Sequence, residues 1–301
     1  MRSFEWRGEK ISQMVLGAAQ LGMDYGIANQ TGQPDKQEAF EILDEAFKNG
    51  VNTIDTAQAY GNSENIIGQW FDQNRDKKSS FNIISKWDAK INDTDQLIKS
   101  AQTSVKTLGV PLWGIMIHDE EHLDHLDTIY QASKVLKKQG LIKYLGASVY
   151  SVEAAKKAII SSNMDFIQVP CNAWDHRMIE GEVFELAKKN DKLCFVRSVF
   201  LQGILIMNST KINNKAPNLS YLHQLWENES ILCNSSKEEF AIEFVKKLKM
   251  PLVFGIELSK QLKSNISLLK LELNFNKYQN SIKRFKKYLK NQEIDPRKWK
   301  S

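Results

Sequence analysis

The sequence predicts a single-domain α/β fold, the (β/α)8 or TIM barrel, followed by a basic C-terminal extension. Short apolar, β-branched runs alternate with longer amphipathic stretches along most of the chain. Eight such units, each of about 30 residues, account for most of the 301 residues. Alternating strands and helices imply parallel strands joined by right-handed crossovers, and eight units in a chain of this length favour closure into a barrel.

The elements follow in a regular order. The predicted strands cover residues 14–17, 52–55, 82–85, 114–117, 143–146, 166–169, 193–196 and 252–254. Between them lie stretches such as 38–47, where apolar residues recur at the spacing of one helix face. Asn49 and Gly50 follow that stretch and are the residue types expected just past a helix C-terminus.

An open, doubly wound sheet is the alternative arrangement of the same units. It usually carries a glycine-rich GxGxxG loop after its first strand. The corresponding residues here, 17–26, read GAAQLGMDYG and do not fit that pattern, and no P-loop pattern occurs. The closed barrel is therefore favoured, and we assign residues 1–276 to it.

Composition narrows the class of protein. Hydrophobic residues make up 42% and charged residues 26%, which is typical of a globular chain. No apolar run approaches the length of a membrane span, and the first residues lack the apolar region of a secretory signal. Three widely spaced cysteines suggest neither a disulfide framework nor a metal clip. We expect a soluble cytoplasmic protein.

The positive charge is concentrated at the C-terminus. Residues 277–301 contain nine basic and two acidic residues, although the whole chain carries only +5. Such a stretch can bind nucleic acid or a membrane surface, but a solvated terminal helix is the simpler interpretation. We expect a basic helical tail over residues 277–301 and no nucleic-acid partner.

Polar side chains stand where successive predicted strands end. Asp55, Lys86 and His118 each follow an apolar run, and Tyr60 lies five residues beyond Asp55. Singly, each has an ordinary explanation: a turn cap, a surface lysine, a core histidine or a loop aromatic. Because βα loops converge on one face of a barrel, together they predict a catalytic site there.

These residue types suit the reduction of a carbonyl group. Hydride addition places negative charge on the carbonyl oxygen, which then needs a proton. Tyrosine has an ordinary pKa near 10, so we expect the Lys86 cation to lower the pKa of Tyr60. Asp55 would keep Lys86 charged and oriented, and His118 would hydrogen-bond the carbonyl oxygen. Tyr60 is the predicted general acid.

The motifs resemble those of the aldo-keto reductases. The stretch 52–64, with its Asp-Thr-Ala-x-x-Tyr-Gly-x-Ser-Glu pattern, is similar to that family's signature, and Lys86 and His118 match the rest of its catalytic tetrad. The likeness continues through residues 146–148, 166–170 and 197–203, and it covers roughly residues 11–272. It implies an NAD(P)H-dependent oxidoreductase acting on an aldehyde or ketone.

The resemblance also implies a nicotinamide site. Ser148 and Gln168 would hold the carboxamide, and the loop 198–203 would cover the pyrophosphate through Ser198, Phe200, Gln202 and Gly203. Residues 255–265 align with the family's adenosine-phosphate motif, in which Gly255, Gln261 and Asn265 are in place. Val149 departs from the pattern, because many members carry Asn there.

Glu257 is the second departure. It stands where an Arg or Lys usually holds the 2′-phosphate of NADP. Repulsion between a carboxylate and that phosphate at ~4 Å costs about 1 kcal/mol at the dielectric of water and about 4 kcal/mol at an effective dielectric of 20. A carboxylate can instead accept a hydrogen bond from a free ribose hydroxyl. Of NADPH and NADH, the sequence therefore favours NADH, unless Lys260 or Lys263 supplies a substitute cation.

The substrate end is less defined. Trp87, Trp174 and Phe200 follow strand ends and either line a substrate pocket or pack the helices, and Arg197 either binds an anionic group or forms a structural ion pair. The run 118–125 contains three histidines and four acidic residues but has no matching second cluster, so we expect no metal site.

The predicted function is reduction of a small carbonyl compound with Tyr60 as the acid. Residues 196–203, VRSVFLQG, resemble bacterial family members associated with surface-sugar pathways, which suggests a sugar-derived carbonyl. The alternative is a non-catalytic, nicotinamide-sensing partner subunit built on the same barrel.

Overall fold

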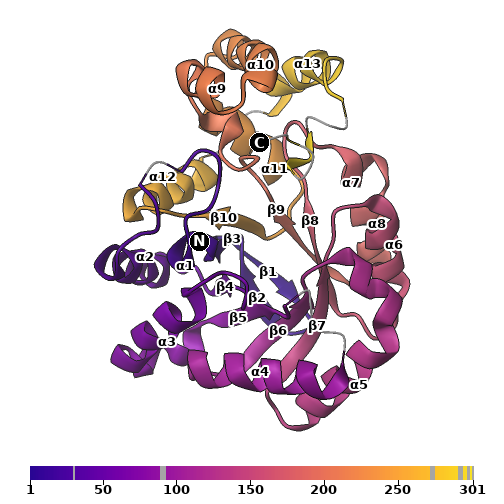
Figure 1. Cartoon of the computed structure of the whole chain (residues 1–301). Coiled ribbons are helices and arrows are strands. Elements are labelled where there is room, and N and C mark those ends of the chain that lie inside the picture. Colours follow the sequence, from indigo (N-terminus) through magenta and orange to yellow (C-terminus); the bar gives the residue numbers. More distant parts are fainter. Residues whose placement is uncertain (30, 89–92, 272–274, 291–293, 297–298, 300–301) are drawn as a thin grey trace.

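Eight parallel strands form a closed barrel (Figure 1). Each strand lies beside the next one along the chain, and the last strand pairs with the first. A computed structural model describes residues 1–29, 31–88, 93–271, 275–290, 294–296 and 299. The barrel strands are β3 (Met14–Gly17), β4 (Thr53–Asp55), β5 (Asn82–Lys86), β6 (Leu112–Ile117), β7 (Ile142–Ser148), β8 (Phe166–Pro170), β9 (Leu193–Arg197) and β10 (Leu252–Gly255). The predicted barrel is confirmed.

Helices surround the barrel as an outer layer (Figure 1). They are α1 (Ala19–Gly22), α2 (Lys36–Lys48), α3 (Ser63–Gln73), α4 (Thr94–Leu108), α5 (Leu126–Lys138), α6 (Val152–Ile160), α7 (Arg177–Glu180), α8 (Val183–Lys189), α11 (Lys237–Lys246) and α12 (Ser259–Lys270). Sequence chemistry sets their ends: the Asp35 carboxylate accepts from the Glu38 amide at the start of α2, and Gly109 ends α4 in a left-handed conformation.

An N-terminal hairpin, which the sequence analysis did not predict, lies at the amino ends of the barrel strands. Strands β1 (Ser3–Trp6) and β2 (Glu9–Ser12) pair antiparallel. Trp6 packs against Trp113 and Tyr144, near the starts of β6 and β7, with ring centroids 6.0 and 4.9 Å away. The hairpin therefore contributes to the core at the end of the barrel opposite the βα loops.

The barrel interior is filled by aromatic side chains. Gly114 and Gly146 make room for Phe166, because a Cβ atom at either glycine would lie within 2.7 Å of the Phe166 ring. Phe166 in turn packs against Trp113 and Phe195. The interior below the βα loops is thus a packed core, as expected for a barrel of eight strands.

Beyond β9 the chain adds a group of helices on the side of the βα loops (Figure 1). It contains α9 (Ser209–Lys215), α10 (Ser220–Leu232) and α13 (Phe275–Lys286). Short 3-10 turns lie at Ile204–Ile206 and Pro217–Leu219 within this stretch, and at Arg75–Ser80 and Glu120–His125 earlier in the chain. Met207 and Asn208, which join this group to the barrel, reach the cavity described below.

Helix α13 falls in the basic C-terminal segment. Tyr278, Ile282 and Phe285 are buried on one face, whereas Lys283 and Lys287 are exposed on the other. Phe285 packs against Trp174 and Trp226, with ring centroids 5.3 and 5.5 Å away. The described part of the basic segment is therefore anchored by its apolar face, and two of its basic side chains pair with acidic residues elsewhere, Arg284 with Glu229 and Lys286 with Glu180.

Candidate active site

A cavity of about 910 Å³ opens at the carboxyl ends of the barrel strands. Strands place their last residues there: Asp55 ends β4, Lys86 ends β5 and Arg197 ends β9. Asp55, Tyr60 and His118 line the cavity. Lys86 lies just behind this lining and is almost fully buried, with 1% of its surface exposed.

The four predicted catalytic residues are linked by direct contacts, and Lys86 makes two of them. Its Nζ donates to Oδ1 of Asp55 at 2.7 Å and to the backbone oxygen of Thr56 at 2.9 Å. The same Nζ lies 4.7 Å from the centroid of the Tyr60 ring, and the edge of that ring faces His118 at a centroid distance of 5.6 Å. The structure thus brings Asp55, Lys86, Tyr60 and His118 into one contiguous cluster.

Electrostatics in the cluster differ from the expectation for Tyr60. Burial, followed by the Asp55 carboxylate, raises the pKa of Tyr60, and the Arg197 charge opposes this only in part. The expected lowering of the Tyr60 pKa is therefore wrong, because burial of the phenol and the nearby Asp55 carboxylate outweigh the neighbouring positive charge. The phenol remains protonated at neutral pH and is a proton donor rather than a phenolate.

The other two titratable partners are also shifted by burial. Burial lowers the pKa of Lys86, while Asp55 acts to raise it. Burial and the Lys86 charge lower the pKa of His118 to about 4, so the imidazole is neutral at pH 7. A neutral imidazole beside a protonated phenol can orient a carbonyl oxygen without competing for its proton.

The residues predicted to bind a cofactor all line the same cavity. They are Ser148, Gln168, Ser198, Phe200, Gln202, Gly203, Gly255, Glu257, Gln261 and Asn265. Ser148 and Gln168 are paired across β7 and β8 in register. Nε2 of Gln168 is buried and has no hydrogen-bond partner among the residues that the structure describes, although most buried polar atoms in proteins have one. An unpaired amide donor at this position fits a ligand that carries an amide oxygen, as a nicotinamide does.

The loop after β9 is shaped by left-handed backbone conformations. Ser198, Leu201 and Gln202 have φ values of 60°, 49° and 53°, and Gly203 has 89°. A Cβ at Gly203 would lie 2.1 Å from Cβ of Ala28, so only glycine fits where this loop meets the loop after β3. The backbone amide of Ala28 also donates to the backbone oxygen of Gln202 at 3.2 Å. Contacts of this kind hold the loop in its unusual backbone conformation.

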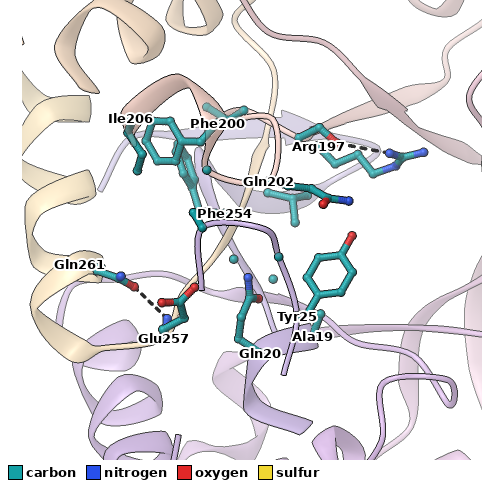
Figure 2. Close-up of a pocket in the computed structure, with 18 of the residues that line it drawn as sticks. Ala19, Gln20, Tyr25, Arg197, Phe200, Gln202, Ile206, Phe254, Glu257 and Gln261 are labelled. Atoms are coloured by element: carbon teal, nitrogen blue, oxygen red, sulfur yellow. Dashed lines mark hydrogen bonds between the residues drawn. The ribbon is translucent and has the colours of Figure 1, made fainter. Parts of the chain in front are cut away.

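The start of α12 forms the far end of the cavity, and Figure 2 shows Glu257 and Gln261 there, away from Arg197. Oε1 of Gln261 accepts from the backbone amides of Glu257 at 2.8 Å and Leu258 at 3.2 Å. Burial raises the pKa of Glu257, which the Gln261 contact partly offsets. Lys260 also lines this end. A helix N-terminus with polar side chains of this kind fits a phosphate or ribose group.

Arg197 lines the cavity, but the two tryptophans predicted to do so are core residues. Trp87 is 2% exposed, and its Nε1 donates to the Leu97 oxygen at 3.0 Å. Trp174 is 1% exposed and packs against Trp226 and Phe285. Both rings are buried among helices and neither is part of the cavity lining, so the substrate-pocket prediction is corrected for Trp87 and Trp174.

Several lining residues were not predicted. Tyr25 and Gln20 come from the loop and short helix after β3, and Tyr150 follows β7. The sequence of residues 17–26 shows no pattern that marks these side chains as part of a site. The aromatic residues that flank the ends of β3 and β7 would have been the sequence signal.

The histidine-rich run forms no metal site in the described residues. There, no three His, Cys, Asp or Glu side chains gather as metal ligands would. Asp124 of this run instead pairs with Lys157, and Cys171, Cys194 and Cys233 are buried free thiols. Among the helices that the structure describes, none has the length and apolarity needed to cross a membrane.

Two curated proteins and one crystal structure are similar to this chain. An oxidoreductase of Bacillus subtilis, YqkF, is 27% identical over 182 residues, which cover 56% of this chain and 54% of that protein. The NADH-specific methylglyoxal reductase of Escherichia coli is 27% identical over 227 residues and 67% of each chain. A crystal structure from Pseudomonas aeruginosa, described as an aldo-keto reductase, superposes with a TM-score of 0.66 at 23% identity and covers 87% of this chain and 91% of that one.

The aligned portions of the curated relatives are partial. The chain spans about half the length of the first of them. The family model, in contrast, matches almost the whole barrel: that of the aldo/keto reductase family aligns with residues 13–286. Together with the closed barrel, this match shows that the chain belongs to the aldo/keto reductase family.

Proposed function

We propose that the protein reduces an aldehyde or ketone to an alcohol with a nicotinamide cofactor and that Tyr60 is the general acid. The cluster of Tyr60, Lys86, Asp55 and His118 at the cavity is the observation that carries this proposal. Burial and the Asp55 carboxylate raise the pKa of Tyr60, so the phenol holds its proton before the reaction, and the proposal relies on the nearby Lys86 ammonium to stabilise the phenolate that forms on proton transfer.

Each residue then has a defined task. The bound nicotinamide would supply the hydride to the carbonyl carbon. The Tyr60 hydroxyl donates its proton to the carbonyl oxygen, and the buried Lys86 ammonium stabilises the resulting phenolate until solvent returns a proton. Asp55 keeps Lys86 oriented, and neutral His118 hydrogen-bonds the same oxygen to fix the substrate's orientation.

The cofactor proposed is NADH. Glu257 places a carboxylate beside the start of α12, where the phosphate of NADPH would meet repulsion of about 1 to 4 kcal/mol, depending on the local dielectric. The relative named NADH-specific methylglyoxal reductase is consistent with this choice. Lys260 lines the same end and is the cation that would weaken the preference.

A substrate panel tests the proposed reaction. Simple aldehydes, ketones and sugar-derived carbonyl compounds are each mixed with the protein and NADH or NADPH, and cofactor oxidation is followed by absorbance. We expect carbonyl-dependent oxidation that is faster with NADH, and faster with sugar-derived carbonyls if the substrate is of that class. Binding of a cofactor without oxidation by any carbonyl compound would instead favour a nicotinamide-sensing partner subunit.

A further inference from the structure

Arg197 is held at the cavity by neutral groups. Its guanidinium carbon lies 3.9 Å from the centroid of the Tyr150 ring. Nη1 is 3.3 Å from the Ser198 hydroxyl, and Nη2 is 3.3 Å from the Val149 backbone oxygen. Both distances are at the long end for hydrogen bonds, and they use two of the five N–H donors of a guanidinium. The ring stacking fixes the plane of the group without neutralising it.

Three other arginines of the chain differ in this respect. Arg7 pairs with Asp165 and Asp191, Arg177 pairs with Asp175, and Arg284 pairs with Glu229. Within the residues that the structure describes, no carboxylate lies within ion-pair distance of Arg197. The structural ion pair considered for it from the sequence is therefore not formed there. A permanently charged, half-buried group that faces a cavity without a counter-ion is positioned to bind an anion.

The anion would lie close to the reacting groups. Arg197, Tyr60 and His118 line one cavity, and the Arg197 charge acts on the pKa of both Tyr60 and His118. Figure 2 shows Arg197 at the opposite end of the cavity from Glu257 and Gln261, with Gln202 and Tyr25 between. The end proposed for the ribose and phosphate groups of the cofactor is therefore separate from Arg197.

We propose that Arg197 binds an anionic group of the carbonyl substrate, so that the enzyme acts on carbonyl compounds carrying a carboxylate or a phosphate. This inference rests on the proposed carbonyl reduction and adds its substrate class. The planar fork of a guanidinium matches two oxygens of either group, which gives orientation as well as attraction. Tyr150 keeps that fork in one plane and contributes specificity without touching the reacting atoms.

Matched substrates test the proposal by turnover. 4-Carboxybenzaldehyde is compared with its methyl ester, and glyceraldehyde 3-phosphate with glyceraldehyde, so that the two pairs distinguish carboxylate from phosphate. We expect kcat/KM to be at least tenfold higher for the anion in one pair. In Arg197→Gln the ratio of kcat/KM for the anionic partner to that for the neutral partner should fall about 10- to 100-fold, as expected for loss of a charged hydrogen bond.

Two further variants separate recognition from net charge and structure. Arg197→Lys keeps the charge but loses the fork, so it should retain only part of the advantage. Lys157→Gln removes a positive charge that pairs with Asp124 away from the cavity lining, and it should leave the advantage unchanged. An equal fall for anionic and neutral substrates in Arg197→Gln, or weakened NADH binding with it, would overturn the proposal in favour of a structural or cofactor role.

A binding experiment keeps the inference testable if no carbonyl compound is reduced. Benzoate and benzamide have similar shapes but differ in charge, and each is titrated into the protein with NADH present, with tryptophan fluorescence or calorimetry as the readout. We expect benzoate to bind at least tenfold more tightly, and the difference to vanish in Arg197→Gln. That result without turnover would sink the proposed reaction but not the anion site, whereas equal binding of the two compounds would sink the anion site.

Discussion

The Lys86 ammonium lies 2.7 Å from Oδ1 of Asp55, and both side chains are almost completely buried at the end of neighbouring barrel strands. Burying either charge alone would be costly, so each depends on the other. The pair also places Lys86 over the Tyr60 ring. Stability and catalysis should consequently be linked through one contact.

Removing only the Asp55 charge should destabilise the protein more than removing the charges of both Asp55 and Lys86. We expect Asp55→Asn to lower the free energy of unfolding by about 3–5 kcal/mol, because it leaves Lys86 buried and unpaired. The double variant Asp55→Asn with Lys86→Met should recover much of that loss, yet show no recovery of turnover. Urea unfolding of both variants measures this, and equal instability of the two would show that the pair's charges are not coupled.

Gln168 should matter for cofactor binding and not for folding. Because its Nε2 has no hydrogen-bond partner in the described part of the chain, Gln168→Met should leave the unfolding free energy unchanged or raise it slightly. The same variant should weaken NADH binding about 5- to 10-fold, from the loss of one hydrogen bond. Thermal unfolding and fluorescence titration give the two numbers.

Gln13 provides a matched control for that variant. It is also a buried glutamine with an unpaired side-chain atom, but it lies at the amino end of β3, outside the cavity lining. Gln13→Met should therefore leave NADH affinity at the wild-type value. Unchanged affinity in Gln168→Met would remove Gln168 from the cofactor site.

The reaction should be insensitive to pH near neutrality. Burial and Lys86 lower the pKa of His118 to about 4, so the imidazole is already neutral well above that pH, and the raised pKa of Tyr60 keeps the phenol protonated on the alkaline side. We expect kcat/KM for carbonyl reduction to vary less than threefold between pH 6 and pH 8. A break near pH 6.5 that disappears in His118→Asn would mean that His118 titrates normally.

The choice of cofactor should depend on Glu257. Glu257→Arg replaces repulsion of a phosphate by attraction, so the ratio of NADPH to NADH affinity should rise at least tenfold, with each charge contact contributing about 1 to 4 kcal/mol. Glu257→Gln removes the repulsion only and should give an intermediate ratio. Fluorescence titration with both cofactors checks this, and a wild-type preference for NADPH that is lost in Lys260→Gln would assign the phosphate to Lys260.

The parts of the fold that repeat were predictable from the sequence. Each barrel strand is an apolar run of a few residues, and the βα loops must share one face, so the positions of Asp55, Lys86 and His118 followed from strand ends alone. The hairpin β1–β2 was missed because two four-residue strands carry too short an alternation to stand out.

Side-chain direction and electrostatics required the structure. Trp87 and Arg197 both stand next to strand ends, yet one is covered by a helix and the other faces the cavity, and sequence position does not distinguish them. The pKa of Tyr60 depends on how deeply the phenol is buried and on how close it lies to Asp55, which only the three-dimensional structure reveals. That no carboxylate of the described residues pairs with Arg197 is likewise a property of three-dimensional packing.

Tyr60→Phe tests the central claim most directly. The variant removes the one proton proposed to reach the carbonyl oxygen and leaves the ring in place beside Lys86 and His118. The measurement is the rate of a single turnover, in which the protein is first saturated with NADH and then mixed with a carbonyl compound that the wild type reduces. We predict NADH affinity within twofold of wild type and a rate lowered by about 10²- to 10⁴-fold, the usual contribution of a general acid. A single-turnover rate equal to that of the wild type would contradict the assignment of Tyr60 as the acid.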